Sequence, residues 1–118
     1  MNNELIRQVW EKANKIEGLD PTLFRKDACG AIMSWAHFDQ DTSFGWVIDH
    51  IFPISLGGDD HLINLRAMNI ANDRSKGDDY PVYRSAVTKD IDDNVPYDKA
   101  FRVNEKLQTQ LAELYGIS

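Results

Sequence analysis

The chain has 118 residues, of which 27% are charged and 42% apolar, and its 13 Lys and Arg against 19 Asp and Glu give a formal net charge of −6. This length fits one domain, because a second core would be too small to be stable. No apolar run approaches the ~20 residues that span a bilayer, and the polar, charged N-terminus predicts no signal peptide. We therefore expect no membrane partner and a cytoplasmic location. The acidic balance argues at first against nucleic acid as a partner, since neutralising phosphates needs Lys and Arg.

The first half of the chain predicts a helix followed by short strands. Apolar residues recur at helical spacing over residues 4–16, and Gly18 follows as a stop signal. Residues 22–36 mix apolar and polar types around a glycine, which predicts short strands or loop. Residues 44–52 alternate aromatic and β-branched types and form the clearest predicted strand. Pro53 limits this strand, because proline cannot donate to a ladder.

The second half of the chain predicts a turn, a returning strand and two helices. Gly and Asp residues at 57–60 are a strong turn signal, and residues 62–68 are expected to return as a strand. Residues 71–78 predict a short helix that stops at a glycine, and the Asp-rich stretch 78–99 is expected to wrap the surface. A C-terminal helix that ends before Gly116 is predicted by one apolar stripe, which consists of Val103, Leu107, Leu111 and Leu114. This mixture predicts an α+β fold.

Four polar residues fall where this order of elements would bring them together. Asp49 and His50 end the first predicted strand, Asn64 follows the turn, and Asp73 lies in the short helix. Carboxylates are the hard oxygen ligands that Mg²⁺ prefers, and an imidazole with a pKa near ~6.5 can take a proton from water. The amide of Asn64 can tie together backbone groups of the turn. The set therefore suits hydrolysis of a phosphodiester.

The geometry of a regular strand works against this convergence. Neighbouring residues on a strand point to opposite faces, so Asp49 and His50 meet at one phosphate only if the strand twists or breaks beside them. Pro53 offers a cause for such a break.

These residues resemble the HNH endonucleases, whose core is the ββα-metal motif. The resemblance covers about 30 residues and extends weakly upstream to residues 24–30. It implies a ββα-metal core at about residues 44–78, flanked by N- and C-terminal helices in one domain that spans residues 1–118. The elements of the family pattern read here as Asp49-His50, Pro53, Ser55, Gly57-Gly58, Asn64-Leu65, and Asp73 with Lys76.

The resemblance implies an endonuclease that hydrolyses DNA with one divalent metal, Mg²⁺ or alternatively Mn²⁺. His50 would be the general base, Asn64 the structural middle residue, and Asp49 a metal ligand. By spacing, the third motif residue is Asp73, where the family usually has His or Asn, and Asn72 is the alternative ligand. We expect no structural zinc, because Cys29 stands alone.

The local charge around the motif reopens the question of nucleic acid. Many of the acidic residues lie outside the motif, at 90–98. We expect four cations in and after the motif to contact phosphates of double-stranded DNA: Arg66, Arg74, Lys76 and Arg84. Two alternatives remain open. One is an HNH-like module that binds DNA or a partner without catalysis, and the other is an acidic protein that mimics DNA and inhibits a DNA-binding protein.

Overall fold

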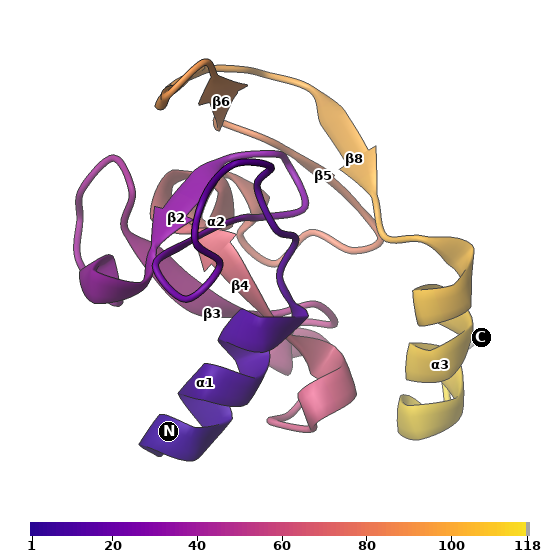
Figure 1. The fold of residues 1–118 in the computed structure, drawn as a ribbon. Helices are drawn as coiled ribbons and strands as arrows, with labels where there is room; N and C mark the ends of the chain where they lie inside the picture. The colour runs from indigo at the N-terminus through magenta and orange to yellow at the C-terminus, as the bar shows by residue number, and fades with distance from the viewer. Residues whose placement is uncertain (118) are drawn as a thin grey trace.

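Antiparallel strand pairs and helices alternate along the chain, which has an α+β fold. The computed structural model describes residues 1–117, and within this range it contains three α-helices and eight short strands paired into four two-stranded sheets. Figure 1 shows α1 below the strands and α3 at the opposite side of the molecule, where it is joined to the rest through β8. The helices are α1 (Asn3–Lys12), α2 (Ile70–Lys76) and α3 (Glu105–Tyr115). The pairs are β1 (Phe24–Lys26) with β2 (Ile32–Ser34), β3 (Trp46–His50) with β4 (Leu65–Asn69), β5 (Val82–Arg84) with β8 (Ala100–Arg102), and β6 (Val87–Asp90) with β7 (Asp93–Pro96).

The pair β3–β4 and the helix α2 that follows it form the centre of the molecule. In the antiparallel register Trp46 lies opposite Asn69, and Asp49 lies opposite Arg66. Asn69 ends β4 and also caps α2, because its side chain accepts a hydrogen bond from the backbone N–H of Ala71 at 2.9 Å. The helix therefore starts without a linker and packs against both strands.

Two apolar clusters enclose this central pair. Alternate residues of β4 point to opposite sides, so Leu65 and Ala67 join one cluster while Met68 joins the other. The first cluster packs α1 against the strands through Trp10 and Trp46, whose ring centroids lie 4.9 Å apart. The second connects the chain after β3 to the C-terminal segment, and its buried members are Cys29, Ile51, Phe52, Met68, Tyr83, Val103 and Leu111.

Most of the expected elements are confirmed with shifted ends. The first helix ends at Lys12, four residues early, because Ala13 is extended and Asn14 pairs with Lys26 of β1. The region 22–36 contains the short strands β1 and β2, and the expected strand at 44–52 is confirmed as β3.

The other ends also move by a few residues. The returning strand begins only at Leu65, because residues 62–64 form a 3₁₀ turn, whereas the helix expected at 71–78 is confirmed as α2. The C-terminal helix begins at Glu105 behind an Asn104 cap rather than at Val103, and it ends before Gly116 as expected.

The stretch 78–99, which was expected to wrap the surface, contains strands that the sequence did not predict. It forms β5, β6 and β7, and β5 is paired with β8 from beyond it. The hydrogen bonds of these strands come from partners that are distant in sequence or joined by a tight turn, which compensates for the weak strand propensity of Asp and Pro. Among residues 1–117 no helix has the length and hydrophobicity that crossing a membrane requires.

Candidate functional site

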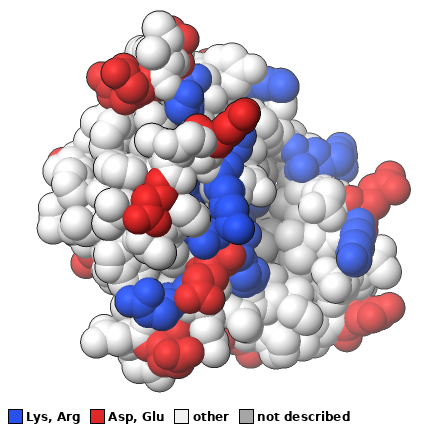
Figure 2. Space-filling model, in the orientation of Figure 1, with Lys and Arg blue, Asp and Glu red and all other residues white. Residues whose placement is uncertain are grey.

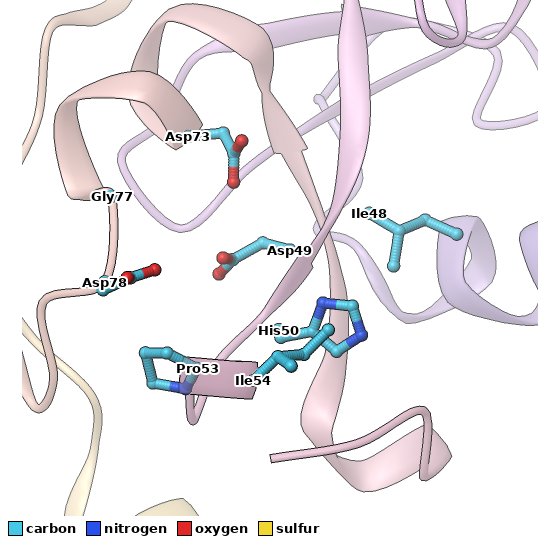
Figure 3. Close-up of a pocket in the computed structure, with 8 residues that line it drawn as sticks. All are labelled: Ile48, Asp49, His50, Pro53, Ile54, Asp73, Gly77 and Asp78. Carbon is cyan, nitrogen blue, oxygen red and sulfur yellow. The ribbon is translucent and has the colours of Figure 1, made fainter. Parts of the chain in front are cut away.

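A cavity of about 280 Å³ opens where β3 ends against α2. Three of the four polar residues singled out in the sequence line it: Asp49 and His50 from β3 and Asp73 from α2. Asp78, just beyond α2, is a further acidic residue on its wall. Figure 3 shows the side chains of Asp49, Asp73 and Asp78 directed into the same space. Three of the residues singled out in the sequence therefore meet at this cavity, whereas Asp78 was not singled out.

Asp49 is buried between two cations. Its side chain is 4% exposed. Arg66, directly across the strand pair, donates from Nε to Asp49 Oδ2 at 2.9 Å. The fully buried Lys76 lies with Nζ 3.3 Å from Asp49 Oδ1 and also donates to the backbone oxygen of His50 at 3.2 Å. One carboxylate thus pairs with two cations that would be costly to bury alone, and its single charge balances one of them.

Asp73 lines the same cavity, and its carboxyl group is a weaker acid than an ordinary Asp. It lies on the face of α2 that points to β3, and its pKa is raised to about 6. Burial is the main cause, and the negative charge of nearby Asp49 adds to it, whereas Lys76 acts in the opposite direction. Asp73 is therefore a second carboxylate beside Asp49, in a cluster that also contains the two cations Arg66 and Lys76.

We expect Asp73→Asn to stabilise the protein near neutral pH. The native pKa lies above the ordinary value of 3.8, so the folded state binds more protons than the unfolded state between about pH 4 and 6, and stability falls as the pH rises through that window. The shift alone corresponds to ~3 kcal/mol, which partial exposure of the side chain reduces to about 1 kcal/mol. Urea unfolding at pH 4 and pH 7.5 would measure this difference.

The gain from Asp73→Asn should be present at pH 7.5 and nearly absent at pH 4. Asp92→Asn, at the exposed tip between β6 and β7, is the matched control and should change stability little at either pH. A loss of stability in Asp73→Asn at pH 7.5 would contradict the electrostatic account of this residue.

His50 faces a different neighbour from Asp49. Its ring Nε2 lies 2.7 Å from Oδ1 of Asp60, which belongs to the loop after Gly58. Figure 3 shows its ring on the other side of the strand from the carboxylate of Asp49, as the alternation of a strand requires. Both residues nevertheless line the cavity, because the regular strand ends at His50 and the chain bends before Pro53. The ladder runs through both residues, because Asp49 pairs with Arg66 and His50 with Leu65, so the chain bends only after His50 and the bend does not bring the two side chains to one face of the strand.

Asn64 fixes the loop that connects the two central strands. It is fully buried. Its Oδ1 accepts from the backbone N–H of Phe52 at 2.7 Å, and its Nδ2 donates to the backbone oxygens of Phe52 at 3.0 Å and Asp59 at 3.1 Å. All of these partners are backbone groups on the two sides of the loop, so Asn64 has the structural position that its residue type predicted.

Asn72, the alternative to Asp73 as the third motif residue, makes its hydrogen bonds outside the cavity. Its amide is fully buried, donates to Asp27 Oδ2 at 2.9 Å, and accepts from the backbone N–H groups of Ala86 and Val87 at 2.7 and 2.9 Å. It does not line the cavity. Of the two residues that the sequence left open, only Asp73 faces Asp49.

Asp27 is a structural residue that the sequence did not single out. Its buried carboxylate accepts from the backbone N–H of Asn69 at 3.0 Å as well as from Asn72, and so connects the loop between β1 and β2 to both ends of the first turn of α2. Burial raises its pKa, while these donors lower it in part. A buried Asp is rare enough to need such partners, but no local sequence pattern reveals them.

The four cations expected to contact DNA are all close to carboxylates. The expectation does not hold for Lys76, whose side chain is fully buried, and Arg66 is largely buried against Asp49. Arg74 and Arg84 are exposed and pair with Asp41 at 3.0 Å and Asp98 at 2.6 Å. Figure 2 shows the same mixture on a larger scale, with a line of Lys and Arg side chains bordered by Asp and Glu.

The donor groups for a metal are few. Within residues 1–117 no three His, Cys, Asp or Glu side chains gather closely enough to form a complete protein cage. Cys29 is buried, and burial raises the pKa of its thiol to about 12, so the thiol is protonated at neutral pH.

Comparison with known proteins adds no relative to this picture, since no family model, curated protein or solved structure matches the chain.

Proposed function

We propose that this protein is a metal-dependent endonuclease of the HNH type that hydrolyses phosphodiester bonds in DNA, with β3, β4 and α2 as its ββα-metal core. The observation that carries the proposal is the shared cavity of Asp49, His50 and Asp73 at the end of β3. Two carboxylates and an imidazole in one solvent-accessible cavity supply ligands for a metal ion and a general base. The spacing of these residues in the sequence resembles the same family.

Asp49 and Asp73 fit a hard divalent cation such as Mg²⁺. This ion often binds through only one or two carboxylates and keeps several waters, so a two-carboxylate site without a third protein ligand suits it. A carboxylate oxygen has more than one lone pair, which lets Asp49 accept from Arg66 and still ligate. When bound, the metal would polarise the scissile phosphate and stabilise the leaving oxygen.

The remaining residues act on the proton and on the shape of the site. His50 in its neutral form accepts a proton from the attacking water at the cavity wall. Asn64 holds the loop after β3 and thereby the end of the strand that carries His50. Lys76 and Arg66 pair with the buried carboxylate of Asp49 and fix its orientation.

DNA would be held by exposed cations that exchange partners. Arg74 and Arg84 are more than half exposed, and exposed ion pairs contribute only ~0–1 kcal/mol, so a phosphate can replace Asp41 or Asp98 at little cost. Few such contacts and a net charge of −6 imply weak binding, and its salt dependence should be shallow because that dependence scales with the number of phosphates neutralised.

The test is cleavage of plasmid DNA by the purified protein. We expect nicked or linear product with Mg²⁺ or Mn²⁺ and none with EDTA. Calorimetry should show that Asp73→Ala weakens metal binding, whereas Asp92→Ala, remote from the cavity in sequence and exposed, should leave it unchanged. Absence of cleavage by the wild-type protein with either metal would refute the proposed activity.

A second candidate is a module of the same fold that binds nucleic acid without cutting it. The engagement of both Asp49 oxygens by buried cations favours this candidate, because a metal would have to share them. DNA binding without metal-stimulated cleavage would identify it.

A further inference from the structure

The contact between His50 and Asp60 defines which ring nitrogen is free. Nε2 of His50 lies 2.7 Å from Oδ1 of Asp60. An ionised carboxylate can only accept, so Nε2 carries the proton, and in the neutral ring the lone pair resides on Nδ1. A base needs that lone pair. The loop residue therefore selects the tautomer in which Nδ1, not Nε2, can receive a proton.

The loop that carries Asp60 is itself fixed in place. Its neighbour Asp59 receives a hydrogen bond from the hydroxyl of Tyr115 at 2.6 Å, and the backbone N–H of Asp59 donates back to that hydroxyl at 3.2 Å. Asn64 holds the backbone oxygen of Asp59 from the inside. At Gly58 an added Cβ would lie 1.9 Å from the backbone oxygen of Phe52, so the close approach of the loop to Phe52 requires a glycine at this position.

Tyr115 comes from α3, the element farthest along the chain. Its ring stacks on Phe52 with centroids 5.5 Å apart, which places its hydroxyl over the loop. The C-terminal helix is thus connected to the cavity through two contacts, Tyr115 with Asp59 and Asp60 with His50, which the peptide bond between Asp59 and Asp60 joins.

We propose that Asp60 is a positioning residue that holds His50 in the Nε2–H tautomer and fixes its ring, and that Tyr115 positions the loop that brings Asp60 to His50. The consequence for the reaction rate rests on the proposed function, but the tautomer does not. Asp60 is 63% exposed, and exposed ion pairs contribute little to folding. Its removal should therefore alter the imidazole without unfolding the protein.

The first experiment reads the tautomer directly. Nitrogen-15 chemical shifts of His50, recorded at a pH where the ring is neutral, should show the Nε2–H form in the wild-type protein. Asp60→Ala should give a mixture of tautomers, whereas Asp60→Asn, whose amide oxygen still accepts, should keep most of the Nε2–H form. Asp92→Ala is the matched control for loss of an exposed carboxylate. An unchanged His50 tautomer in Asp60→Ala would overturn the inference.

The second experiment separates positioning from simple charge. Loss of an acidic group near the cavity should strengthen DNA binding, yet Asp60→Ala should lower kcat by about 10- to 100-fold, the range typical of groups that orient an imidazole through its second nitrogen. A purely electrostatic role would instead lower KM and leave kcat unchanged, and this result would also overturn the inference.

A double-mutant cycle tests the part played by α3. Tyr115→Phe keeps the ring on Phe52 but removes the hydroxyl, and we expect a smaller loss of kcat. Because Tyr115 acts through Asp60, the double variant Asp60→Ala/Tyr115→Phe should be no slower than Asp60→Ala alone. Fully additive losses would contradict this connection. If the wild-type protein cuts no DNA, the proposed function fails, while the nitrogen-15 measurement still decides the role of Asp60.

Discussion

Replacing His50 by alanine is expected to lower kcat for DNA cleavage by about 10²–10⁴-fold, the usual contribution of general-base catalysis. The loss should appear in kcat and not in the affinity for DNA or metal, because Asp49 and Asp73 remain and His50 makes no contact with either that the structure records. Its side chain is partly exposed and its partner Asp60 is a surface residue, so the fold should tolerate the change. Steady-state cleavage kinetics together with calorimetric metal titration would measure both parts.

His37 offers a matched control for the removal of an imidazole. It lies in the 3₁₀ turn after β2, where its Nδ1 contacts the hydroxyl of Thr42 at 2.8 Å, and it does not line the cavity. His37→Ala should therefore leave cleavage unchanged. Equal cleavage activity of His50→Ala and wild-type protein would remove His50 from the mechanism.

The residues of the cavity could be predicted because the chemistry is local in sequence. Asp49 and His50 end a strand whose pattern is clear, and the helix that carries Asp73 follows the next strand directly. A strand pair continued by a helix has few ways to fold back, so short spacings determine which side chains meet. The role of Asn64 was also predictable, since a buried amide between two loop ends has a recognisable purpose.

The partners of these residues could not be predicted, because they come from distant segments or depend on burial. Lys76 looks like an ordinary basic residue at the end of an exposed helix, and only the packing of α2 against β3 buries it beside Asp49. Tyr115 reaches Asp59 across 56 positions. Asp27 and Asn72 meet across 45 positions. Hydrogen bonds of this range leave no periodic signal in one sequence.

The structure also shows that the cations near the motif pair with carboxylates of the protein itself. The cations near the motif are used first to neutralise carboxylates inside or near the site: Arg66 and Lys76 serve Asp49, while Arg74 pairs with Asp41. The acidic total of −6 is therefore not offset by a free basic strip. Affinity for a polyanion would depend on the bound metal and on exchange of exposed ion pairs more than on a preformed positive surface.

Replacing Asp49 by alanine is expected to destabilise the protein by about 3–5 kcal/mol, because removal of one member of a buried ion pair leaves uncompensated charge behind. Here two cations lose their partner, since Lys76 is fully buried and Arg66 is largely so. Asp49→Asn keeps the shape and one acceptor oxygen, so its loss should be smaller. Both variants should lose metal affinity. Chemical denaturation in EDTA would isolate the effect on stability from any effect of metal.

Two companion variants separate burial from mere charge pairing. Asp98→Ala breaks the exposed pair with Arg84, whose atoms lie 2.6 Å apart, and should cost under ~1 kcal/mol despite the shorter distance. Lys76→Met in the Asp49→Asn background removes the buried cation as well and should recover part of the stability, because an apolar side chain of similar length suits the same space. If Asp49→Ala were as stable as Asp98→Ala, the charges around Asp49 would have to be solvated in solution, and the buried position of Asp49 would be wrong.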